Sequence, residues 1–82
     1  MIRVEVLYFA QLKEAMRVDR ETIGVEEGAS VQDVLRLIGE RPEWTSVRAL
    51  PLSFAVNEEI VDRTRSLRDG DRLALLPPVS GG

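Results

Sequence analysis

A central segment of this sequence has the apolar spacing of an amphipathic helix, and the segments on both sides of it alternate like strands. Its apolar residues recur three and four positions apart, which gives one stripe along a helix: Val31, Val34, Leu35 and Ile38. Ser30 followed by Asp33 is close to a capping box, so we expect the helix to begin there. Gly39 weakens the end of the helix, and Pro42 prevents simple continuation. We therefore expect this stripe to cover a sheet built from the flanking segments.

Residues 2–9 have the best-defined strand pattern of the chain. Residues that favour strands occupy one parity of this segment: Ile2, Val4, Val6 and Tyr8. On the other parity, Leu7 and Phe9 stand where a solvated strand would be polar. One face of this strand is therefore expected in the core, and the opposite face carries two apolar side chains that need an explanation.

Three further segments of the first part of the chain predict short elements. Residues 11–16 are rich in helix formers but too few for more than a turn or two. Residues 21–25 favour a second strand, which stops before a glycine. Residues 42–50 are predicted as a short second helix with proline at its first position.

The second half of the chain predicts three strands. Residues 52–57 alternate, and a turn at residues 57–59 leads into the brief strand 60–61. Asp69-Gly70-Asp71 is a turn signal before residues 72–76, a nearly continuous apolar run that is typical of a central strand. Two strands, a covering helix and later strands that end beside the first predict an α+β fold of the β-grasp, or ubiquitin-like, type.

Composition excludes several classes of function. The chain has 82 residues, which is enough for one domain, and it contains no cysteine and no histidine. Disulfides, zinc sites built on these residues, thiol nucleophiles and imidazole bases are therefore excluded. A net charge of −3 with mixed signs provides no basic face for nucleic acid or anionic lipid. With no signal-peptide pattern and no apolar run of membrane-spanning length, we expect a cytosolic protein.

The last six residues predict an extended tail, residues 77–82, on a domain of residues 1–76. Pro77 and Pro78 favour an extended exit that cannot return to a sheet ladder. Gly81 and Gly82 can follow a channel too narrow for side chains, and six extended residues span about 20 Å. The alternative is a frayed terminus without function.

Four segments in order along the whole chain resemble the small subunit of molybdopterin synthase. They are Phe9-Ala10-Gln11-Leu12-Lys13-Glu14, Ala55-Val56-Asn57 with its turn, Leu67-Arg68-Asp69-Gly70-Asp71, and Leu76-Pro77-Pro78-Val79-Ser80-Gly81-Gly82. A terminal Gly-Gly alone is a weak signal, whereas the combination with Pro-Pro-Val-Ser directly before it is specific.

This resemblance implies that the reactive group is the C-terminal carboxylate. In that family an E1-like, ATP-dependent enzyme adenylates the last glycine, here Gly82, which then becomes a thiocarboxylate. The tail, here Pro77, Pro78, Val79, Ser80 and Gly81, enters the large subunit and delivers sulfur to cyclic pyranopterin monophosphate for the molybdenum cofactor. The resemblance also implies a hetero-oligomer, a heterotetramer in that family. The chain would be a carrier that binds no cofactor and no metal itself and is not catalytic in isolation.

The partner-binding surface is expected on the apolar side of the first strand. Leu7 and Phe9, with Leu76 and Ala74 on the neighbouring last strand, would form an exposed patch of the kind found at interfaces. The alternative is that the segment around Trp44 covers them. Some members of the family carry an aromatic residue where this chain has Leu76, which affects the interface and not the tail chemistry.

The remaining charged positions favour structural interpretations. Paired carboxylates occur at Glu58 with Glu59 and at Asp69 with Asp71, where they could serve catalysis or bind a metal. We expect solvated turns instead, because turns commonly use such residues for local hydrogen bonds. Four arginines could guide the tail to an acidic or phosphate-bearing partner, although solvated charges are the simpler interpretation: Arg63, Arg65, Arg68 and Arg72.

Two other functions are compatible with the sequence. One is a related ubiquitin-like sulfur carrier that serves thiamine thiazole synthesis, tRNA thiolation or protein modification, although the length and the Pro-Pro-Val-Ser stem argue against the thiazole carrier. The other is a non-catalytic β-grasp interaction module whose Gly-Gly end is incidental, because a fold does not determine a function.

Overall fold

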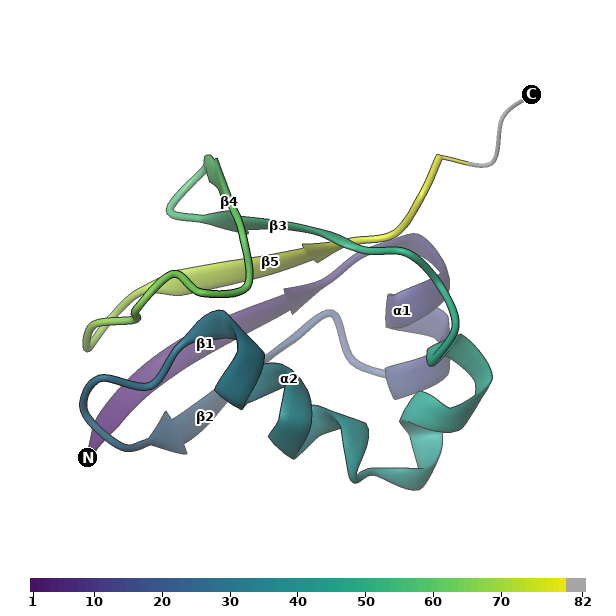
Figure 1. The fold of residues 1–82 in the computed structure, drawn as a ribbon. Coiled ribbons are helices and arrows are strands. Elements are labelled where there is room, and N and C mark those ends of the chain that lie inside the picture. The colour runs from purple at the N-terminus through teal and green to yellow at the C-terminus, as the bar shows by residue number, and fades with distance from the viewer. Residues whose placement is uncertain (80–82) are drawn as a thin grey trace.

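Five strands form one mixed sheet in the order β2-β1-β5-β3-β4 (Figure 1) in the computed structural model, which describes residues 1–79. The strands are β1 (Ile2–Tyr8), β2 (Arg20–Val25), β3 (Ser53–Val56), β4 (Glu59–Val61) and β5 (Arg72–Leu76). The central strands β1 and β5 are parallel, and the other neighbours are antiparallel. The final apolar run is therefore a central strand beside the first, and the predicted β-grasp arrangement is confirmed.

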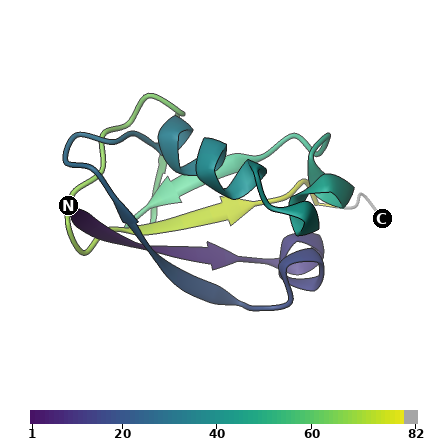
Figure 2. The same cartoon turned by 90° about the horizontal axis from the view of Figure 1, so that it is seen from below.

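The helical elements are α1 (Ala10–Met16), α2 (Val31–Gly39) and the 3₁₀ helix η1 (Pro42–Val47). Figure 2 shows α2 lying across one face of the sheet. The predicted strand parity is confirmed, because Val4 and Val6 of β1 are fully buried with Val34 and Ile38 of α2 in one core cluster. The opposite face of the sheet is called the outer face below. Within residues 1–79, no helix has the length and apolar character needed to cross a membrane.

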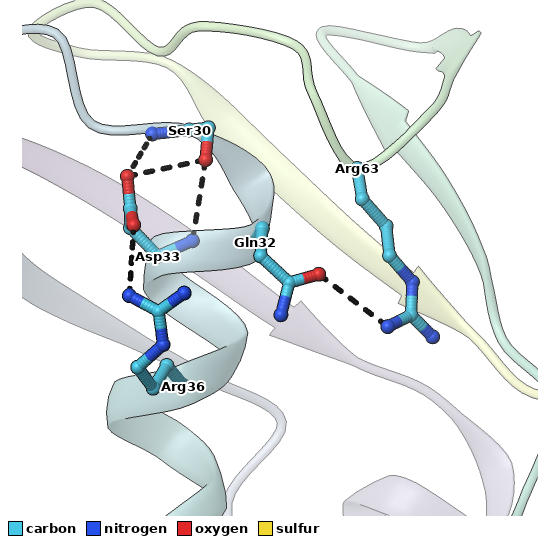
Figure 3. A network of polar contacts seen from close by, with 5 residues as sticks. All are labelled: Ser30, Gln32, Asp33, Arg36 and Arg63. Atoms are coloured by element: carbon cyan, nitrogen blue, oxygen red, sulfur yellow. Dashed lines mark hydrogen bonds and ion pairs between the residues drawn. The ribbon is translucent and has the colours of Figure 1, made fainter.

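The start of α2 is the predicted capping box (Figure 3). The Ser30 backbone N–H donates to Asp33 Oδ2 at 2.9 Å, and the Asp33 N–H donates to Ser30 Oγ at 3.3 Å. The Ser30 hydroxyl also donates to Asp33 Oδ2 at 3.1 Å, and this bond and that of the Ser30 N–H hold the pKa of the Asp33 carboxyl below its usual value. The next two helical N–H groups, of Val31 and Gln32, donate to the carbonyls of Arg65 and Arg63. The loop before β5 thus satisfies donors that a helix start otherwise leaves free.

Two predicted elements, over residues 42–50 and 52–57, are shorter in the structure, and several other predicted bounds shift by one residue. The segment predicted as a helix over residues 42–50 is the shorter 3₁₀ helix Pro42–Val47. The strand predicted over residues 52–57 ends at Val56 because Asn57 and Glu58 have φ of 51° and 72°. Positive φ at both central residues is the geometry of a tight hairpin turn that matches the twist of the strands, here β3 and β4.

A polar network connects β1 and β2 to Arg41, the residue directly before η1. The Tyr8 hydroxyl donates to Glu21 Oε2 at 2.6 Å, and Arg41 Nη1 pairs with the same oxygen. Burial alone would raise the pKa of Glu21, but the hydrogen bonds from Arg41 and Tyr8 and the charge of Arg41 outweigh it and lower that pKa. Burial, together with the bond to Glu21, raises the pKa of the Tyr8 hydroxyl. This network ties β1, β2 and the segment after α2 together.

We predict that Glu21→Gln makes the folding stability less sensitive to acid. A carboxyl whose pKa is lower in the folded state stabilises the fold above its unfolded pKa, about 4.3, and this contribution is lost as the pH falls through the folded value. The variant should lose about 1 kcal/mol at neutral pH and approach wild type at low pH. Urea unfolding across this range measures the effect, with the exposed Glu14→Gln as control. An equal difference between Glu21→Gln and wild type at every pH would contradict the prediction.

Candidate functional site

The outer face carries a row of apolar side chains that crosses four strands. Leu7 of β1 lies opposite Ala74 of β5, Ala74 lies opposite Ala55 of β3, and Ala55 lies opposite Ile60 of β4. We call these four residues the apolar row. Ile60 is 69% exposed at the end of the row, whereas Ala55 is buried between its neighbours. Small residues in the middle and larger ones at the ends leave a surface that is hollowed between its ends.

Phe9 and Leu76 continue this surface at the end of the sheet where the chain leaves β5. Tyr8 lies opposite Leu75, which places the next residues, Phe9 and Leu76, side by side. Phe9 is 45% exposed and Leu76 is half-buried. Trp44 is part of the core cluster, to which neither Leu7 nor Phe9 belongs, so the alternative that its segment covers them is wrong. The structure therefore brings the three predicted interface residues, Leu7, Phe9 and Leu76, onto one open surface.

A shallow hollow of about 440 Å³ lies over the apolar row, lined in part by Leu7, Phe9 and Ala74. Arg72 also lines it and pairs through Nε with Glu5 Oε1 at 3.2 Å. Glu5 is shared with Arg20 of β2, whose Nη1 lies 3.8 Å from Oε2. Charged side chains thus flank the apolar hollow on one side, which is the usual division between the centre and rim of an interface.

The predicted turn carboxylates at Asp69 and Asp71 make structural hydrogen bonds, one within the turn and two to distant segments of the chain. Asp71 is buried, a difference from the solvated position that we predicted, and it accepts from the Arg68 N–H at 2.8 Å and from Asn57 Nδ2 at 2.9 Å. Asp69 Oδ1 accepts from the Arg3 N–H at 2.8 Å. Across residues 1–79 no group of three His, Cys, Asp or Glu is arranged to hold a metal ion. These residues join the turn before β5 to β1 and to the β3–β4 hairpin.

Among the other arginines that we singled out, Arg63 has side-chain contacts with Phe54 and Gln32. The Arg63 guanidinium carbon lies 5.6 Å from the centre of the Phe54 ring, and its Nη1 donates to Gln32 Oε1 at 3.4 Å (Figure 3). Of this group, only Arg72 lies in the hollow of the outer face. A role for the set in guiding the tail has no support from its placement.

The tail begins at the end of β5, beside Phe9. Pro77 is half-buried, and Pro78 and Val79 are exposed as the chain runs away from the sheet (Figure 1). Ser80, Gly81 and Gly82, on which the predicted tail chemistry depends, lie outside the described residues. The described part of the tail therefore begins directly beside the apolar surface.

Sequence reasoning missed Ile60 as part of this surface. We predicted residues 60–61 only as a brief strand, without assigning a face to each residue. A two-residue turn at Asn57 and Glu58 would have placed Ile60 opposite Ala55, and therefore on the same face as Leu7. The signal in the sequence was Asn57, because asparagine tolerates the left-handed backbone conformation that such a turn requires.

Comparison with known proteins matches nearly the whole chain. Residues 6–82 match the ThiS family. The molybdopterin synthase sulfur carrier subunit of Chlamydomonas reinhardtii is 37% identical, with 99% of this chain and 100% of the relative covered. The human molybdopterin synthase sulfur carrier subunit is 38% identical, with 100% of this chain and 97% of the relative covered.

Three solved structures have the same fold. A putative molybdopterin converting factor subunit 1 from Pyrococcus furiosus is 31% identical, with a TM-score of 0.83 over 96% of this chain and 100% of that one. Small archaeal modifier protein 1 of Haloferax volcanii is 28% identical, with a TM-score of 0.84 over 96% of this chain and 100% of that one. A complex of subunits 1 and 2 of the molybdopterin-converting factor from Helicobacter pylori contains a chain that is 27% identical, with a TM-score of 0.75 over 99% and 100%.

Proposed function

Because this chain belongs to the ThiS family, we propose that it is the sulfur carrier subunit of a molybdopterin synthase. One observation carries the proposal: relatives of that name are 37% and 38% identical to this chain over essentially the full length of both proteins. The match extends through Gly82, so the segment that would react is included. The absence of cysteine and histidine from the sequence fits a carrier whose terminal carboxylate is the reactive group.

In the proposed reaction the Gly82 carboxylate attacks the α-phosphate of ATP on an E1-like enzyme, and pyrophosphate leaves. The resulting acyl-adenylate is needed because a carboxylate resists displacement of its oxygen. Sulfur at the oxidation level of hydrosulfide then displaces AMP and leaves a thiocarboxylate on Gly82. This sulfur passes to cyclic pyranopterin monophosphate, and water restores the Gly82 carboxylate. ATP belongs to the activating enzyme, and this chain supplies the acyl group without a bound cofactor.

The outer face is the proposed docking surface for the large subunit. The apolar row, Phe9 and Leu76 provide an exposed apolar area, and the tail starts beside it. A six-residue tail reaches about 20 Å from Leu76, so a partner docked on this face can receive the terminus in its interior. Two such pairs would form the heterotetramer. The need for ATP in the proposed activation step supports a cytosolic location.

We predict that the chain gains a thiocarboxylate at Gly82 when it is coexpressed with its activating enzyme and a sulfur source. Intact mass spectrometry should detect the exchange of one oxygen for sulfur, and fragmentation should place it on Gly82. Deletion of Gly82, or one residue added after it, should abolish pterin conversion while the fold is kept, because only the terminal carboxylate reacts. An unmodified terminus, under conditions that modify a known carrier, would exclude a sulfur carrier.

We predict that Ile60→Glu weakens binding to the large subunit roughly 10-fold or more, because it puts a charge at the end of the apolar row. Isothermal titration calorimetry with the purified large subunit measures the effect. Val18→Glu is the matched control, since Val18 is also an exposed apolar residue but lies between α1 and β2, outside the outer face. Equal affinities of Ile60→Glu and Val18→Glu would show that the apolar row is not the docking surface.

A second candidate function is protein modification. The likeness to small archaeal modifier protein 1 at a TM-score of 0.84 favours it over the thiazole and tRNA alternatives, although the identity is 28%. A modifier would be found in amide linkage to lysine side chains of other proteins, whereas a carrier for pterin synthesis would be recovered as a free thiocarboxylate. A plain β-grasp interaction module would give neither product.

A further inference from the structure

A second hollow, of about 520 Å³, lies between the end of β2 and one side of α2. We call it the acidic groove and define it by Met1, Gly24, Glu26, Glu27, Leu37 and Glu40, which line it. Val25, in the same segment, pairs with Ile2 at the beginning of β1, whereas the tail leaves from the other end of the sheet (Figure 1). The groove also shares no lining residue with the hollow of the outer face.

The α2 side of the groove is one helical stripe. This stripe runs beside the core stripe that contains Val34 and Ile38. Its residues are spaced three, one and three positions apart: Asp33, Arg36, Leu37 and Glu40. Leu37 is 47% exposed, and Met1, on the other side of the groove, is 90% exposed. Two large apolar side chains therefore face solvent at this groove.

The charge of the groove is negative. Glu26, Glu27 and Glu40 are exposed, and none of them has an ion-pair partner within residues 1–79. Asp33 is already bonded to Ser30 and Arg36 (Figure 3). No group of three His, Cys, Asp or Glu within residues 1–79 could hold a metal ion. The three exposed glutamates are instead available to separate cationic side chains of a partner.

The edge of β2 that borders the groove has free backbone groups. The Tyr8 N–H donates to the Asp19 carbonyl at 2.8 Å, which fixes the alternation of the antiparallel ladder with β1. In this ladder every second residue of β2 bonds to β1. Counted from Asp19, the backbone groups that bond to β1 are those of Glu21, Ile23 and Val25. The N–H and C=O groups of Thr22 and Gly24 therefore point away from the sheet, since β2 is an edge strand. Gly24 has no side chain to keep another backbone away.

We propose that the acidic groove and the free edge of β2 bind an extended segment of a partner protein in which arginine or lysine side chains surround an aliphatic residue. The segment adds to β2 as a further strand through Thr22 and Gly24. Its cationic side chains meet Glu26, Glu27 and Glu40, and its aliphatic side chain packs on Leu37 and Met1. Because the groove and the outer face are separate, this partner can bind while the tail is engaged elsewhere. The proposal is independent of the sulfur-carrier function.

The test uses the full chain and a synthetic nonapeptide of alternating arginine and valine, with a glutamate-for-arginine peptide as control. Amide chemical shifts should change saturably within residues 22–27 and 33–40, and the affinity should fall when ionic strength is raised about tenfold. The exchange of the Thr22 and Gly24 amide protons with solvent should slow in the complex. Shift changes that do not saturate, or unchanged exchange at both amides, would overturn the proposal.

Two double variants distinguish specific binding in the acidic groove from nonspecific attraction of a cationic peptide to an acidic protein. Replacing both Glu26 and Glu27 by lysine should weaken peptide binding about 10-fold, since two attractive contacts become repulsive. The same change at Glu58 and Glu59 alters the net charge equally at another exposed turn and should leave binding within about 2-fold. Equal losses in both double variants would overturn the groove as the site.

A separate variant, Thr22→Pro, tests whether the peptide adds to β2 as a strand. Thr22→Pro removes an N–H that points away from β1, so it leaves the internal ladder intact and should abolish slowed exchange at Gly24 and weaken peptide binding. An amide spectrum with wild-type dispersion confirms that the variant is folded. If the variant is unfolded, the exchange measurement on the wild-type chain decides the question. Wild-type affinity in a folded Thr22→Pro chain would overturn strand addition.

Discussion

The parallel pairing of β1 with β5 is the contact on which the rest of this structure depends. It joins the first and last strands of the chain in the centre of the sheet, where Val6 lies opposite Leu73 and both are fully buried. β2 pairs with β1 and β3 pairs with β5, while β4 is attached to the sheet through β3. The same pairing places Phe9 beside Leu76, so the register of the core also fixes where the tail begins and which apolar residues surround its base.

The two faces of the sheet have different compositions for a physical reason. Residues that face α2 are large aliphatic side chains because they fill a closed core, as Val4 and Leu75 do. The outer face has alanine at two successive positions of one row, Ala55 and Ala74, and no helix of residues 1–79 packs there (Figure 1). A surface with small residues in its middle can receive side chains from another protein. The sheet therefore forms the core on one face and presents the proposed docking surface on the other.

Local patterns predicted much of this architecture from the sequence. The stripe with Val34 and Ile38, the cap at Ser30 and the alternation in β1 depend on residues close together in the chain, and all three are confirmed. The features that escaped prediction depend on distant partners. The burial of Asp71 requires Asn57, and the bond between Tyr8 and Glu21 is reinforced by Arg41. The interface residues Leu7 and Phe9 were predicted because they broke a local rule of polarity, whereas Ile60 needed knowledge of the turn before it.

The central position of β5 makes folding of the domain depend on its last strand. A chain that lacks residues 72–76 leaves both β1 and β3 without their neighbour, so the sheet is divided in two and the core is open. During translation the N-terminal segments emerge first but must wait for the last strand, because pairing over such a long separation cannot begin earlier. The folded domain consequently forms only when β5 is available to pair with β1 and β3. A chain truncated before β5 would stay unfolded and would not present the apolar row of the outer face.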